Sequence, residues 1–147
     1  MKPALLIVED EPDMRAALCD LLAEERCRVL SAADGAAGLR LIEREVPALV
    51  VTDLRMAVMN GWDFVDEILA RDDLRNLPVL VFSADPRRPA SLPGTISTFT
   101  KPDDLDRLVA AVHAILAAGR ERRRPAHARR RGAASTWGRR RSARRGR

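Results

Sequence analysis

The feature that most constrains the fold is a short apolar run that stops abruptly on one acidic residue. The stretch ALVVTDLRMAVMNG spans residues 48–61, and its apolar part shows no polar alternation before Asp53. Such a run is typical of a strand that is covered on both faces of a parallel sheet. Asn60 and Gly61 then indicate a turn into a helix. Because ligands bind at the carboxyl ends of strands in open parallel sheets, we expect Asp53 to lie at a functional site.

Three further apolar runs also end on a polar or charged side chain. These side chains are Glu9 and Asp10 after residues 4–8, Ser83 after residues 77–82, and Lys101 after residues 95–100. Parallel strands bring their carboxyl ends to the same edge of a sheet, so the four groups are expected to meet there. Carboxylates gathered in this way form a hard, all-oxygen pocket that suits Mg²⁺.

The order of the elements predicts the fold class. Strand patterns alternate with amphipathic helical patterns, which indicates an α/β fold with a doubly wound, five-stranded parallel sheet. The one break in this alternation is the segment DPRRPASLPG at residues 85–94, which contains three prolines. Proline disrupts helix interiors, so we expect a shortened or irregular fourth helix at this place.

The charge of the chain is divided between two regions. Residues 119–147 hold 13 of the 26 Lys and Arg residues and one of the 21 acidic residues, a balance of +12, which leaves −7 for residues 1–118. We therefore expect one folded domain over residues 1–118 and a disordered, Arg-rich tail over residues 119–147. The apolar runs are far shorter than a membrane span, so we expect no membrane segment and a cytoplasmic protein.

The residues at the four strand ends, in this order, resemble those of the receiver domain of two-component response regulators. The resemblance extends from about Pro3 to about Leu116. The residues that carry it are Glu9-Asp10, Asp53 followed by Met56, Met59 and Gly61, Ser83-Ala84, and Lys101-Pro102. It implies the flavodoxin-like receiver fold and a role in phosphorelay signal transduction, without enzymatic action on a separate substrate.

The resemblance also implies a chemistry for each residue of the site. Asp53 would accept a phosphoryl group from a phosphohistidine on a histidine kinase or phosphotransfer protein, and Ser83 and Lys101 would hold its oxygens. Mg²⁺ would be bound directly by Asp10, Asp53 and the backbone carbonyl of Arg55, with Glu9 acting through water. The phosphorylated domain would then signal through a downstream protein partner.

One position departs from the family pattern, and one further pair of residues flanks the predicted site. The aromatic switch residue of the family corresponds to Thr98 here, so either the neighbouring Phe99 serves in its place or the aromatic coupling is absent. Arg55 and Asp85 each lie two residues beyond a site residue. We expect them to pair at the mouth of the pocket, with a solvated surface pair as the alternative.

The Arg-rich tail supports a second class of function. Nucleic-acid phosphates would be engaged by its arginines, among them Arg129, Arg130, Arg131, Arg139, Arg140 and Arg141. The alternatives are binding to the acidic domain of the same chain, or no selected role. A phosphatase with an Asp nucleophile is a third class, but such enzymes need a second Asp two residues after the first, where this chain has Arg55.

Overall fold

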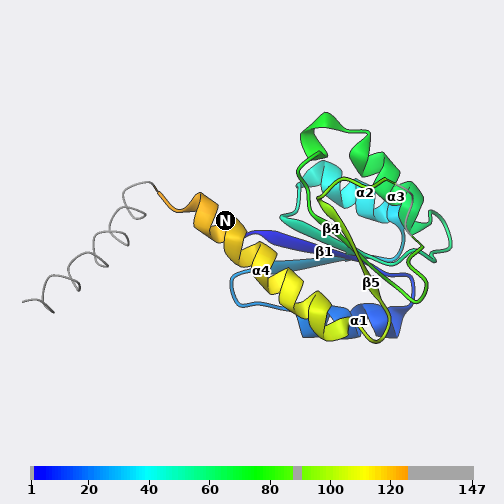
Figure 1. The fold of residues 1–147 in the computed structure, drawn as a ribbon. Helices are drawn as coiled ribbons and strands as arrows, with labels where there is room; N and C mark the ends of the chain where they lie inside the picture. Colours follow the sequence, from blue (N-terminus) through cyan, green and yellow to red (C-terminus); the bar gives the residue numbers. More distant parts are fainter. Residues whose placement is uncertain (1, 88–90, 126–147) are drawn as a thin grey trace, which may run out of the picture. The chain divides into compact units, whose positions relative to one another are not determined.

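The computed structural model describes residues 2–87 and 91–125, and it contains one parallel five-stranded sheet. The strands run in the order β2-β1-β3-β4-β5, and every neighbouring pair is parallel (Figure 1). They are β1 (Ala4–Val8), β2 (Arg28–Ala32), β3 (Leu49–Thr52), β4 (Val79–Ser83) and β5 (Ile96–Thr100). The predicted fold class is confirmed.

In the described residues, four helices and one short 3-10 helix connect the strands or follow them. They are α1 (Pro12–Leu22), α2 (Gly35–Arg44), α3 (Gly61–Leu69), the 3-10 helix η1 (Asp72–Leu74) and α4 (Leu105–Arg123). Side chains cap three of the helices at their N-termini, where backbone N–H groups lack partners within the helix. Glu11 caps α1, Asp34 caps α2 and Asn60 caps α3. None of the helices in the described part of the chain is long and apolar enough to cross a membrane.

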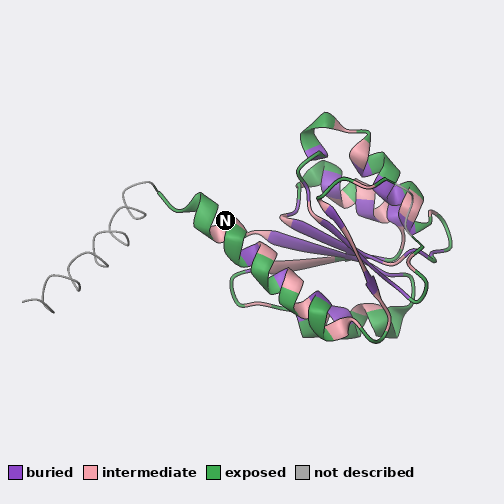
Figure 2. Ribbon diagram, in the orientation of Figure 1, coloured by how far each residue is buried: buried purple, intermediate pink, exposed green. Residues whose placement is uncertain are grey.

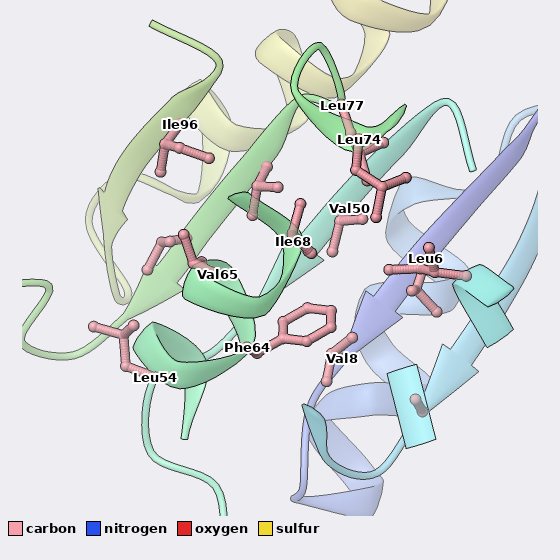
Figure 3. Packing of buried hydrophobic residues seen from close by; sticks show 14 of the residues in the cluster. Leu6, Val8, Val50, Leu54, Phe64, Val65, Ile68, Leu74, Leu77 and Ile96 are labelled. Atoms are coloured by element: carbon pink, nitrogen blue, oxygen red, sulfur yellow. The ribbon is translucent and has the colours of Figure 1, made fainter. Parts of the chain in front are cut away.

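Buried side chains form one apolar cluster on each face of the sheet. On one face, Phe64, Val65 and Ile68 of α3 pack against β1 and β3 residues such as Val8 and Val50 (Figure 3). On the other face, α1 and α4 pack against the alternate strand residues, because successive side chains point to opposite sides. All residues of β1, β3 and β4 are buried, as expected for strands covered on both faces (Figure 2).

The connection between β4 and β5 has no helix in its described residues. Residues 84–87 and 91–95 are bends, turns and irregular backbone, and residues 88–90 lie outside the described residues. The prediction of a shortened or irregular fourth helix is therefore confirmed for the described part of this segment. Leu92 packs against the apolar cluster beneath α3, so the connection still covers part of that face.

The C-terminal helix corrects the predicted start of the tail. The domain was predicted to end at residue 118, with the tail beginning at residue 119. Residues 119–123 were predicted to be disordered, but they are the last residues of α4. Arginine and glutamate, which make up residues 120–123, are good helix formers, and arginines at a helix C-terminus interact favourably with its dipole. Residues 126–147, which include the six tail arginines named above, lie outside the described residues.

Gly61 fixes the position of the loop that carries Asp53. A Cβ atom at this position would lie 2.1 Å from the Asp53 carbonyl oxygen and 2.7 Å from the Leu54 Cα atom. The Gly61 N–H also donates to the Leu54 carbonyl oxygen at 2.9 Å. Only a residue without a side chain therefore allows α3 to start this close to the end of β3.

We predict that Gly61→Ala lowers the free energy of unfolding by about 2–3 kcal/mol, because backbone atoms must move to accept the methyl group. Urea unfolding followed by circular dichroism measures the change. Gly94→Ala is the matched control, since a Cβ there would meet no atom within 4 Å. Equal stability of the two variants would contradict this account of Gly61.

Candidate functional site

The site lies where the chain changes direction across the sheet. From β1 the chain first moves outward to β2 and then returns to β3 on the other side of β1. The carboxyl ends of β1 and β3 are adjacent, since Val8 pairs with Thr52 and the Asp53 N–H donates to the Val8 carbonyl oxygen at 3.1 Å. Such a switch point is where open α/β sheets form their ligand-binding crevice.

Three acidic side chains gather at this switch point. One carboxylate oxygen from each of Glu9, Asp10 and Asp53 lies within 4.8 Å of the others. Glu9 is 3% exposed, whereas Asp10 faces solvent. A divalent cation that prefers oxygen ligands and keeps several waters fits this combination of buried and exposed carboxylates, so the residues fit Mg²⁺.

Lys101 reaches the acidic cluster from the end of β5. Its Nζ atom lies 3.1 Å from Asp53 Oδ2 and 3.2 Å from Glu9 Oε2. Its backbone N–H donates to the Ser83 carbonyl oxygen at 2.8 Å, which ties the ends of β4 and β5 together. The predicted meeting of Lys101 with the acids is therefore present in the structure.

Burial and charge shift the proton affinities of this cluster. The pKa of Glu9 is raised from 4.5 to about 7, chiefly by burial and then by the negative charge of Asp53, while Lys101 opposes both effects. Burial acts to lower the pKa of Lys101, but its contacts with Asp53 and Glu9 outweigh burial and raise it. The site thus holds one positive charge firmly against an acidic pair that resists carrying two negative charges.

The remaining predicted residues lie on β4 and β5 in different environments. Ser83 ends β4 and is buried, as the strand pattern predicted. Thr98 and Phe99 are neighbours on β5 and so face opposite sides of the sheet. Phe99 is buried in the cluster with α1 and α4, whereas Thr98 is half-buried. Whether either one acts as a switch stays a prediction.

One predicted contact is wrong. Arg55 and Asp85 do not pair, because Asp85 forms an ion pair with Arg87 at 3.0 Å. Arg87 is two residues away along the same chain segment, so this local pair forms without bringing two loops together. The Arg55 side chain is exposed, and the other role predicted for this residue, which concerns its backbone carbonyl, stays a prediction.

The structure adds two residues that the sequence pattern did not single out. Arg15 of α1 donates from its guanidinium to the Glu9 carbonyl oxygen at 2.9 Å, which holds the loop carrying the acids. The Phe82 ring lies with its centroid 5.5 Å from Lys101 Nζ. Strand alternation predicts that Phe82 lies on the side of the sheet that α1 covers. The sequence pattern does not predict the path of the Lys101 side chain across the edge of the sheet, and so it does not predict this contact.

Comparison with known proteins places this site in a family. The family described as the response regulator receiver domain matches residues 5–113. Transcriptional regulatory protein GlrR of Escherichia coli is 38% identical over 116 residues, which cover 76% of this chain and 26% of GlrR. Sporulation initiation phosphotransferase F of Bacillus subtilis is 28% identical, over 76% of this chain and 92% of that protein. The chain therefore spans about a quarter of the first relative and most of the second.

A solved structure shares the fold of this chain. The crystal structure of a sensor protein from Polaromonas sp. JS666 superposes with a TM-score of 0.70 at 25% sequence identity. The superposition covers 80% of this chain and 98% of that one.

The raised pKa of Glu9 predicts how stability depends on pH without a metal ion. The folded state holds the Glu9 proton more tightly than the unfolded state, so folding loses stability as the pH rises from about 4.5 to about 7. We expect Glu9→Gln, which cannot ionise, to be more stable than the native chain by about 2–3 kcal/mol at about pH 8, and the stabilities of the two to converge below about pH 4.5. Urea unfolding in the presence of a chelator measures the free energy of unfolding of the native chain and of Glu9→Gln at each pH. A pH-independent difference would contradict the prediction.

Proposed function

The chain belongs to the response regulator receiver domain family, and on this premise we propose that Asp53 is its phosphoacceptor. The observation that carries the proposal is the contact of Lys101 with both Asp53 and Glu9, beside the exposed carboxylate of Asp10. This arrangement supplies a nucleophile, a cation site and a fixed positive charge, which are the parts that phosphoryl transfer requires.

Asp53 is held in place for attack on a phosphorus atom. Its Oδ1 atom accepts a hydrogen bond from the Leu54 N–H at 2.6 Å, and its Oδ2 atom contacts Lys101. An oxygen of Asp53 forms the new bond to phosphorus while the bond from phosphorus to the donor's nitrogen breaks, which yields an aspartyl phosphate.

The other site residues hold the charges that surround the transferred group. Asp10, Asp53 and the backbone carbonyl of Arg55 would hold Mg²⁺ directly, and Glu9 would act through water. When bound, the ion neutralises charge on the phosphoryl oxygens. Lys101 and the Ser83 hydroxyl take the remaining oxygens, because the ends of β4 and β5 are tied together beside Asp53.

The donor in this proposal is the phosphohistidine of a histidine kinase or phosphotransfer protein, met in the cytoplasm. The output is a contact with a downstream protein that depends on phosphorylation. Thr98 lacks the ring used by the family switch, and the described part of the β4–β5 connection lacks a helix. Phe99 is the only aromatic residue of β5, so any aromatic coupling along that strand depends on it.

We predict that the chain gains one phosphoryl group when it is incubated with acetyl phosphate and Mg²⁺, as measured by intact mass. Asp53→Asn removes the adduct because the amide is a poor nucleophile, and a chelator reduces the labelling by more than about tenfold. Asp66→Asn is the matched control, since Asp66 is an exposed acid on α3. A native chain that stays unmodified, or an adduct that persists in Asp53→Asn, would refute the proposal.

The distribution of charge favours nucleic-acid binding by the tail as a second candidate function. Residues 119–147 carry 13 arginines and a single acidic residue. Each arginine that engages a phosphate releases a counterion, so affinity for nucleic acid would depend steeply on salt.

We predict that the full chain binds duplex DNA and loses about 10³- to 10⁵-fold in affinity between about 50 and 200 mM salt, for about 6 to 10 phosphate contacts. Fluorescence anisotropy of a labelled duplex measures the affinity. A chain in which Arg129, Arg130, Arg131, Arg139, Arg140 and Arg141 are all changed to Gln keeps its length and should lose the binding. Equal binding by this variant would eliminate the second candidate.

A further inference from the structure

The Lys101 ammonium has a third neighbour besides the two carboxylates. The centroid of the Phe82 ring lies 5.5 Å from Lys101 Nζ, within the distance at which an aromatic face attracts a cation. Only 17% of the Lys101 side chain is exposed, so few waters compete with the ring for the ammonium. Phe82 is itself 3% exposed and cannot easily turn away.

The position of Phe82 follows from the alternation of β4. Ser83 ends the strand, and Phe82, one residue earlier, points toward α1 and the start of α4. There it lines an apolar cavity of about 140 Å³ together with Lys101 itself. The other lining residues are Met14, Ala17, Leu18, Leu21, Pro102 and Leu105. None of these is an acid, so Phe82 supplies the aromatic face that the cation meets on this side.

We infer that Phe82 is a positioning residue, whose ring face keeps the Lys101 ammonium directed at Asp53. This inference rests on the proposed function, because it concerns the amine that holds the transferred phosphoryl group. A lysine side chain has four rotatable carbon–carbon bonds and swings freely unless its charged end is confined. The carboxylates of Glu9 and Asp53 confine it on one side, and Phe82 limits its movement on the apolar side.

The chain contains a matched control for this inference. Phe99 lies directly across from Phe82 in the register of β4 and β5, and it is buried in the same apolar cluster. Among the described residues, the Phe82 ring has the recorded cation contact and the Phe99 ring does not. A purely structural role would therefore make the two rings respond alike.

The experiment replaces Phe82, in the full chain, with phenylalanines that carry one, two or three ring fluorines. Fluorine weakens the negative face of the ring stepwise while the shape of the ring changes little, and the same series is placed at Phe99. We expect the rate of phosphorylation by acetyl phosphate to fall stepwise for Phe82, by about threefold to tenfold over the series, and to stay within about twofold for Phe99. Mg²⁺ affinity, measured by calorimetry, should not change in either series. A flat Phe82 series, or equal falls in both series, would overturn the inference.

A second measurement does not require phosphorylation. Carbon relaxation in solution reports the order of the Lys101 side chain at its terminal carbon, and we expect the order parameter to fall in Phe82→Leu but not in Phe99→Leu. If the native chain takes no phosphoryl group, the proposed function fails while this measurement still decides the inference. Equal order parameters in the native chain and Phe82→Leu would refute it.

Discussion

The site depends on the placement of one ammonium group between two carboxylates. Lys101 Nζ contacts both Asp53 and Glu9. These acids follow β3 and β1, which are adjacent because the chain returns from β2 to the other side of β1. Two partly buried carboxylates at this separation repel each other, and the raised pKa of Glu9 reflects that burial and repulsion. The positive charge of Lys101, and a cation bound at the acids, offset this repulsion. The residues that stabilise the folded site are therefore the same residues that carry its proposed chemistry.

Much of the fold could be predicted because its strands carry strong signals. The runs at residues 4–8 and 48–52 show no polar alternation, and an acid follows each run directly. This pattern places the acids at the ends of the strands. The prolines at residues 85–94 likewise predicted the irregular connection correctly. The end of α4 was missed, because the density of charge in residues 119–123 suggested disorder, whereas arginine and glutamate favour helix locally.

The contacts within the site could be predicted only in part. The sequence order of Glu9, Asp53 and Lys101 indicates that they meet, but side-chain paths across the edge of a sheet leave no periodic pattern. The contacts of Phe82 with Lys101 and of Arg15 with the Glu9 carbonyl are of this kind. The expected Arg55–Asp85 pair failed for a related reason, since a local partner, Arg87, competes for Asp85 at little entropic cost.

The central claim is that Asp53 accepts the phosphoryl group while Lys101 holds it. A crystal structure of the full chain with Mg²⁺ and beryllofluoride, a stable mimic of a phosphoryl group, tests this claim most directly. The account predicts beryllofluoride bonded to Asp53, with Lys101 Nζ within hydrogen-bonding distance of a fluorine and Mg²⁺ against Asp10 and Asp53. Beryllofluoride bound elsewhere, or bound to Asp53 while Lys101 contacts only Glu9, would contradict it.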